Sequence, residues 1–134
     1  MDMEFLREKR DAKRIYNTLS NIVMRQAIPD LKIEWMEDPD KRLIILQYIY
    51  GVALELSADY NTSGHAVNKA MEKLFTKNFG MSSLQAEFET DKLLQTKAGS
   101  REMEVVGAGC ENTRMFNSGE LFTPFGRLIE ILRA

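Results

Sequence analysis

Residues 41–57 read KRLIILQYIYGVALELS, an almost continuous apolar run in which Gln47, Gly51 and Glu55 recur at every fourth position. This spacing would place all three on one edge of an α-helix. As a strand, the even-numbered residues would also form a uniform apolar face, so periodicity alone leaves both structures open. The preceding Asp38-Pro39-Asp40 favours the helix, because it combines an N-cap acceptor with proline at the first helical position. We therefore predict a largely buried central helix with one narrow polar edge.

The composition predicts one domain spanning residues 1–134, with 44% hydrophobic and 28% charged residues, as in ordinary globular proteins. No apolar run reaches the roughly 18 residues needed to cross a bilayer, and the first ten residues lack the apolar core of a secretory signal. Cys110 is the single cysteine, so we expect a reducing, cytoplasmic location. A net charge of −2 argues against bulk attraction to nucleic acid or anionic lipid, and we expect no membrane contact.

Four further segments carry helical patterns. Apolar residues recur at helical spacing over residues 3–26 and again over 63–79, where Gly80 follows as a stop signal. Ser82 and Gln85 form a capping box that opens a helix reaching Leu94, and Thr123-Pro124 begins a terminal helix. Residues 30–37 fit either a short helical turn or an extended piece.

Residues 97–120 are rich in glycine, serine and asparagine and predict a loop, with a short β-hairpin near residues 101–116 as a candidate. Together with the helical segments, this predicts a mainly α fold, a compact bundle of about five helices.

Catalytic signatures are sparse. The chain has one histidine, His65, and the glycine-rich stretch before Cys110 lacks the lysine of a phosphate-binding loop. No cysteine pair or histidine motif suggests zinc. We assign no catalytic, cofactor-binding or metal-binding residues. Our third hypothesis is an enzyme whose site is built from carboxylates, His65 or Cys110. The alternative is that His65 is a partly exposed residue at the start of a helix and that Cys110 is a small thiol without a function.

One basic line marks a candidate nucleic-acid surface, and it consists of Lys69, Lys73 and Lys77 with Asn68 beside them. The order of polar and apolar residues in this segment is typical of a helix-turn-helix recognition element, although the segment lacks an arginine that could recognise guanine. An ordinary solvated lysine face is the alternative. A second basic cluster in the first helix (Arg7, Lys9, Arg10, Lys13, Arg14) would frame a groove with this line if both faced the same side.

Apolar residues near the C-terminus form the candidate partner surface: Met115, Phe116, Leu121 and Phe122. Alternatively, Leu121 or Phe122 would serve as a hydrophobic staple beside the Thr123 cap. Our leading hypothesis is a non-enzymatic cytoplasmic protein that binds a partner protein or a second copy of itself as a homodimer, in the manner of an adaptor, inhibitor or small chaperone. A helix-turn-helix nucleic-acid-binding protein is the second hypothesis.

Overall fold

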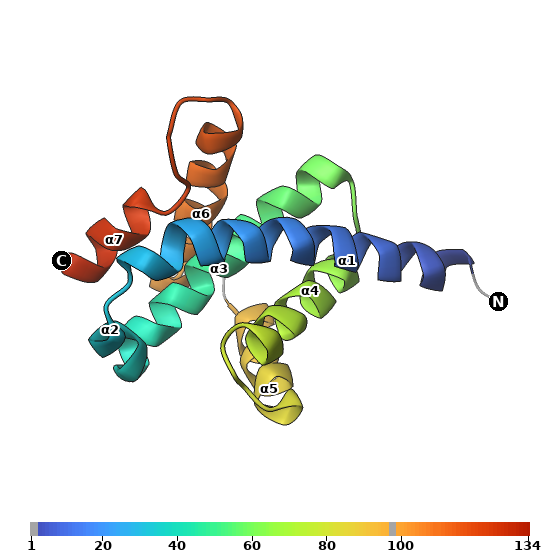
Figure 1. Cartoon of the computed structure of the whole chain (residues 1–134), viewed down its shortest axis with the longest axis horizontal. Helices are drawn as coiled ribbons and strands as arrows, with labels where there is room; N and C mark the ends of the chain where they lie inside the picture. Colours follow the sequence, from blue (N-terminus) through green and yellow to red (C-terminus); the bar gives the residue numbers. More distant parts are fainter. Residues whose placement is uncertain (1–2, 97–98) are drawn as a thin grey trace.

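The computed structural model describes residues 3–96 and 99–134, and its regular elements in these ranges are all helical (Figure 1). The mainly α prediction is therefore confirmed. The α-helices are α1 (Met3–Ile22), α2 (Ile33–Glu37), α3 (Pro39–Tyr60), α4 (Gly64–Lys77), α5 (Ser83–Leu94), α6 (Arg101–Asn117) and α7 (Gly126–Arg133). A π-helical turn (Val23–Ala27) and a 3₁₀ turn (Ile28–Asp30) connect α1 to the residues before α2.

Two of these helices, α2 and α6, are additional to the five that the sequence predicted. The short α2 resolves the open alternative for residues 30–37 in favour of a helical turn. The hairpin predicted near residues 101–116 is wrong, because this segment forms the continuous helix α6. Residues 97 and 98 of the predicted loop lie outside the described part of the chain.

Helix α3 is the centre of the molecule, as predicted. It packs against α1, α2, α4, α6 and α7, and α1 crosses in front of it in Figure 1. Its residues from Ile45 to Ile49 are buried in unbroken succession. A helix that is apolar around most of its circumference needs neighbours on most sides, which explains this central position.

The helix ends follow the capping signals of the sequence. The Asp38 carboxylate accepts hydrogen bonds from the backbone N–H groups of Asp40 and Lys41, at 3.0 and 3.4 Å. Asn61 ends α3 in the left-handed conformation, with φ of 54°, which asparagine tolerates better than most residues. The Ser82 hydroxyl caps α5 by accepting from the Gln85 N–H at 3.1 Å. These caps satisfy backbone groups that a helix end leaves unpaired.

The polar edge of α3 faces α6. A Cβ atom added to Gly51 would overlap the carbonyl oxygen of Val106, and one added to Gly109 would overlap the carbonyl oxygen of Tyr48. The two backbones therefore touch at these glycines. The Cys110 thiol donates to the Gly51 carbonyl oxygen across the same contact, at 3.2 Å.

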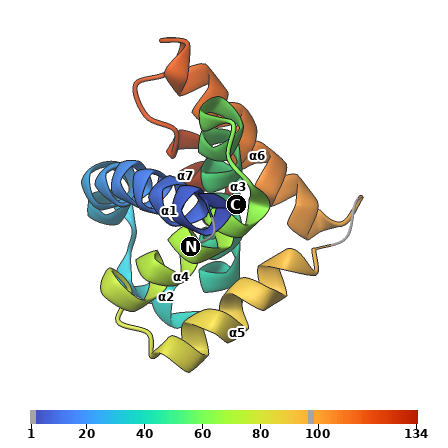
Figure 2. The same ribbon diagram turned by 90° about the vertical axis from the view of Figure 1, so that its right-hand side faces the viewer.

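Polar pairs continue this interface toward the C-terminal ends of both helices. The Arg114 guanidinium donates to both carboxylate oxygens of Glu55 at 3.3 and 3.4 Å, and Asn117 donates to Asp59 at 2.7 Å. Residue numbers rise together along the two helices, so α3 and α6 run in the same direction, side by side in Figure 2. Their N-terminal ends meet at one end of the molecule.

The glycine contact predicts opposite effects of alanine at two positions in α6. Gly109→Ala should destabilise the fold by about 2 kcal/mol, because its methyl group would strike a backbone that cannot rotate away. Gly107→Ala should stabilise it by about 0.5 to 1 kcal/mol, because this exposed helical position has open space for a methyl group. Urea unfolding of both variants measures the two changes. Equal effects would contradict the close backbone contact.

Candidate functional site

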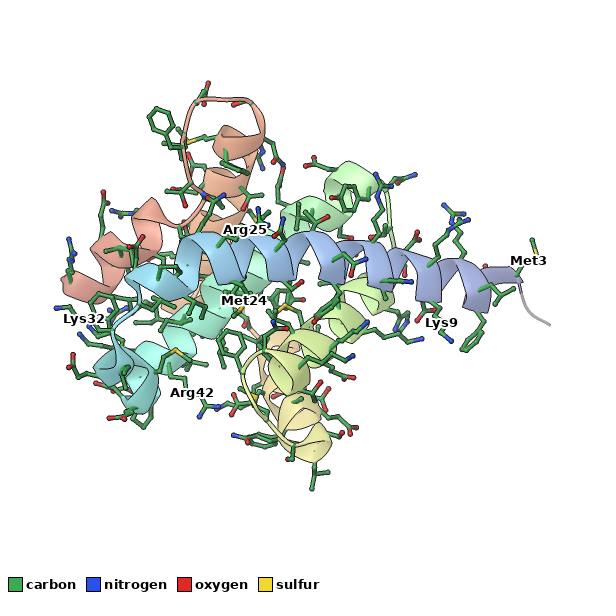
Figure 3. All side chains as sticks on the ribbon, in the orientation of Figure 1. Met3, Lys9, Met24, Arg25, Lys32 and Arg42 are labelled. Atoms are coloured by element: carbon green, nitrogen blue, oxygen red, sulfur yellow. The ribbon has the colours of Figure 1, made fainter. Side chains whose placement is uncertain are left out.

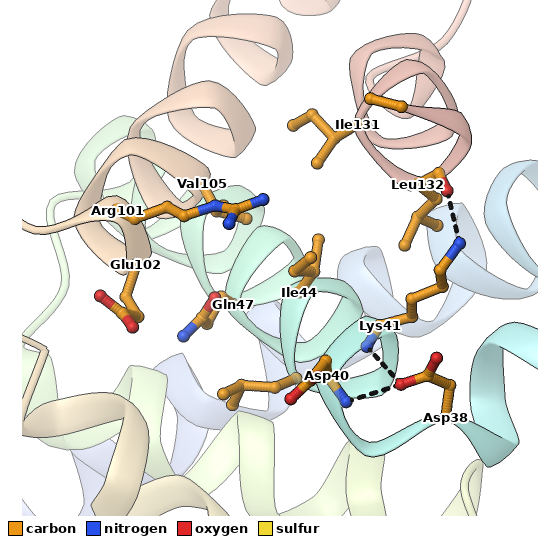
Figure 4. A pocket seen from close by; sticks show the side chains of 12 residues that line it. Asp38, Asp40, Lys41, Ile44, Gln47, Arg101, Glu102, Val105, Ile131 and Leu132 are labelled. Atoms are coloured by element: carbon orange, nitrogen blue, oxygen red, sulfur yellow. Dashed lines mark hydrogen bonds between the residues drawn. The ribbon is translucent and has the colours of Figure 1, made fainter.

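A cleft opens where the N-terminal ends of α3 and α6 meet the C-terminal end of α7 (Figure 4). Its larger hollow has a volume of about 510 Å³, and a second hollow of about 280 Å³ lies between α3, α5 and the start of α6. Leu43, Gln47 and Glu102 line both hollows, so the two form one continuous cleft. Volumes of this order are typical of ligand sites.

The walls of the larger hollow are mainly apolar and its rim is charged. Aliphatic side chains from three helices form the walls, namely Leu43, Ile44, Val105, Ile131 and Leu132. The rim carries both signs of charge, from Asp38, Asp40, Lys41, Arg101 and Glu102. Two of these groups are already engaged: Asp38 caps α3, and Lys41 donates to the Leu132 carbonyl oxygen at 2.9 Å.

Gln47 is the polar group inside this cleft. The residue is only 4% exposed and lines both hollows, and Figure 4 shows its side chain near Glu102 of α6, on the side of the cleft away from α7. Its amide forms no hydrogen bond or ion pair with any residue in the described ranges, although Glu55 and Asp59 on the same edge of α3 are both paired. Among the described residues, the Oε1 atom of Gln26 is the buried side-chain polar atom without a hydrogen-bond partner, so the amide of Gln47 is not sealed from solvent and stays open to a ligand that enters the cleft.

Two lysines of the predicted nucleic-acid surface, Lys69 and Lys73, face the basic cluster of α1. Lys9 and Lys13 of α1 and Lys69 and Lys73 of α4 line one hollow of about 250 Å³ around Ala12, which we call the lysine groove. Figure 3 shows Lys9 projecting from the part of α1 that extends beyond the body of the molecule.

Local contacts occupy part of that basic line. Lys69 lies 3.1 Å from the Glu8 carboxylate and 5.3 Å from the Phe5 ring centre, and Lys73 lies 4.4 Å from the Tyr16 ring centre. Lys77 is exposed outside the groove and Asn68 is half-buried. Helix α4 also packs against α1, α3 and α5. Helix α4 therefore shares its basic surface with α1. A recognition helix, in contrast, projects from its domain so that it can enter the major groove.

The four residues of the predicted partner surface gather at the end of α6 and in the loop before α7, and we call them the apolar tip. Met115, Phe116 and Leu121 are half-buried, whereas the Phe122 side chain is fully exposed, at 101% of its reference area. The staple alternative is therefore wrong for Phe122.

Hydrogen bonds fix both ends of the tip loop. After α6, the Gly119 and Glu120 N–H groups donate to the carbonyl oxygens of Phe116 and Met115, at 3.1 and 2.9 Å. This is a Schellman motif, and Gly119 supplies its required positive φ of 85°. Before α7, the buried Tyr48 hydroxyl donates to the Pro124 carbonyl oxygen at 2.5 Å. Burial raises the pKa of this tyrosine well above its usual value, so it remains a hydrogen-bond donor.

The residues of the enzyme hypothesis lie in unrelated surroundings. His65 lines a shallow hollow between α1 and the start of α4, and Cys110 lies against Gly51 in the α3–α6 interface. Burial and the nearby Glu55 carboxylate raise the pKa of the Cys110 thiol, which disfavours the nucleophilic thiolate. Within the described residues, no group of three metal-binding side chains converges on one point.

The sequence alone does not predict the cleft, although it contains one indication of it. Gln47 is a polar residue in an apolar helix, but the hollow also requires α6 and α7, and the sequence predicts a loop where α6 lies. In the described ranges, no helix has the length and apolar character required to span a bilayer.

No protein-family model matches this chain, and no curated protein or solved structure matches it. Its function must therefore be argued from its own surfaces.

Proposed function

We propose that this chain is a non-enzymatic binding protein that contacts a partner protein through the apolar tip. The full exposure of the Phe122 ring is the observation that carries the proposal. Aromatic side chains are prominent among the residues that dominate protein interfaces, because burying one ring removes a large apolar area from water. A ring that none of the described residues covers is available for that role.

The fixed loop adds a second argument. Phe122 lies between the Schellman motif of α6 and the bond from Tyr48 to Pro124, so the loop is held on both sides. Binding then costs less conformational entropy than it would for a flexible segment. The half-buried Met115, Phe116 and Leu121 surround the anchor with further apolar area. The occupant that fits is a protein with an apolar pocket, and a second copy of this chain is the alternative occupant.

This proposal predicts that Phe122→Asp abolishes partner capture without affecting the fold. Proteins captured from an extract of the source organism are compared by quantitative mass spectrometry for the wild type, Phe122→Asp and the control Phe88→Asp. Phe88 is 62% exposed on α5, away from the tip, so its variant introduces the same chemistry elsewhere. We expect capture to fall at least about tenfold for Phe122→Asp alone, since burying one ring contributes roughly 1.5 to 3 kcal/mol.

Sedimentation velocity of the same three proteins separates the two occupants. If the partner is a second copy of this chain, the wild type should form a dimer at high concentration, and Phe122→Asp should remain a monomer. Identical capture profiles and identical masses for wild type and Phe122→Asp would contradict the proposal.

Nucleic-acid binding is the second candidate, favoured by the four lysines that line one groove on α1 and α4. Lys9 and Lys13 have no ion pair among the described residues, so they are available to phosphates. The Glu8 carboxylate forms an ion pair with Lys69, and the Glu72 carboxylate also interacts electrostatically with that lysine. The acidic net charge keeps this proposal second.

The lysine groove predicts salt-sensitive binding that depends on charge position. Fluorescence anisotropy of a random duplex, at about 50 and then 150 mM salt, should show weak binding that the higher salt removes. Lys9→Glu with Lys73→Glu should abolish it. The control, Arg25→Glu with Lys32→Glu, makes the same change in net charge at exposed positions away from Lys9, as Figure 3 shows. Absence of binding at the lower salt, or equal loss in both variants, would exclude this function.

A further inference from the structure

The cleft at the N-terminal ends of α3 and α6 has the features of a second binding site, independent of the apolar tip. The tip lies at the other end of α6, some three helical turns from the cleft residues Arg101 to Val105. Gln47 supplies a donor and an acceptor where the two hollows meet, and neither is paired with another described residue. A ligand of this cleft would therefore meet both kinds of hydrogen-bonding group side by side.

The charges on the rim restrict the ligand. Across the two hollows, the three bases Lys41, Lys92 and Arg101 balance the three acids Asp38, Asp40 and Glu102. Neither Arg101 nor Glu102 forms an ion pair with another described residue. A polyanion or a polycation would meet like charges, so a neutral ligand is favoured. The aliphatic walls favour apolar groups on that ligand. A purely apolar chain would leave the Gln47 amide unpaired and desolvated.

We propose that this cleft binds an extended peptide segment of a partner protein. Gln47 pairs through its amide N–H and C=O with the backbone C=O and N–H of one residue of the segment, and an apolar side chain enters each hollow. In an extended chain the N–H and C=O of one residue point to the same side, so a primary carboxamide can offer a donor and an acceptor to these two groups at once. A helical segment does not fit, because its backbone groups are already bonded to one another.

The pattern of side chains follows from the same geometry. In an extended chain, residues at positions i and i+2 point to the same face. The two hollows share Leu43, Gln47 and Glu102 and flank the Gln47 amide. The segment that fits therefore carries apolar residues at alternate positions, without a concentration of one charge.

The experiment is a selection from a phage-displayed library of random 12-residue peptides on the folded full chain. The enriched peptides are then synthesised with a fluorescent label and titrated by anisotropy. We expect apolar residues at alternate positions in the enriched set. Affinity should fall at least tenfold for Gln47→Met, which keeps the length of the side chain and removes both hydrogen-bonding groups. Affinity should be unchanged for Phe122→Asp.

A stability measurement, one further variant and a control selection keep the result decisive. Gln47→Met should have a Tm equal to or above that of the wild type, because the glutamine has no partner to lose among residues 3–96 and 99–134. Ile131→Glu tests the opposite wall from α7 and should also weaken binding, since it places a charge in the apolar hollow. Failure to enrich any peptide above an uncoated control would overturn the proposal.

Binding that Gln47→Met and Ile131→Glu both leave intact would overturn it as well. Peptides that bind the wild type and lose affinity in Phe122→Asp would place the site at the tip instead. That outcome would support the proposed function while excluding the cleft.

Discussion

The contact between the backbones of α3 and α6 is the constraint on which the other features depend. Gly51 and Gly109 lack the atoms that would separate the two helices, so the peptide planes themselves pack together. Close packing of this kind gains dispersion energy over many atom pairs at once. It also sets the register, which brings Arg114 to Glu55 and Asn117 to Asp59. The parallel direction of the helices then places both N-terminal ends at the cleft.

Sequence reasoning succeeded where local chemistry determines local structure. Asp38-Pro39 marks the start of α3, and Ser82 marks the start of α5, because a cap needs only residues a few positions apart. The same reasoning failed for α6, because Gly107 and Gly109 count against a helix on propensity alone. Gly109 is explained by a partner 58 positions earlier in the chain, which no local pattern contains. Tertiary packing overrides propensity in α6.

The two proposed sites occupy opposite ends of the same pair of helices and differ in chemistry. At the C-terminal end of α6, an exposed aromatic ring on a fixed loop offers apolar area. At the N-terminal ends, a buried amide and a rim of balanced charges offer hydrogen bonds between apolar walls. The sequence predicts the polar edge of α3, and the residues of this edge have separate roles. Gly51 and Glu55 contact α6, whereas Gln47 has no hydrogen-bond partner in the part of the chain that the structure describes. The position of α6 determines which residues of this edge make contacts and which one faces the cleft.

A double-mutant cycle between Gly51→Ala and Gly109→Ala tests the central contact most directly. Each methyl group alone would force the helices apart, at about 2 kcal/mol of unfolding free energy. If the two glycines form one contact, the second methyl group enters space that the first has already opened. We therefore predict that the double variant loses at least about 1 kcal/mol less stability than the sum of the single losses. Additive losses would contradict the account, because they would mean that the two glycines act at separate places.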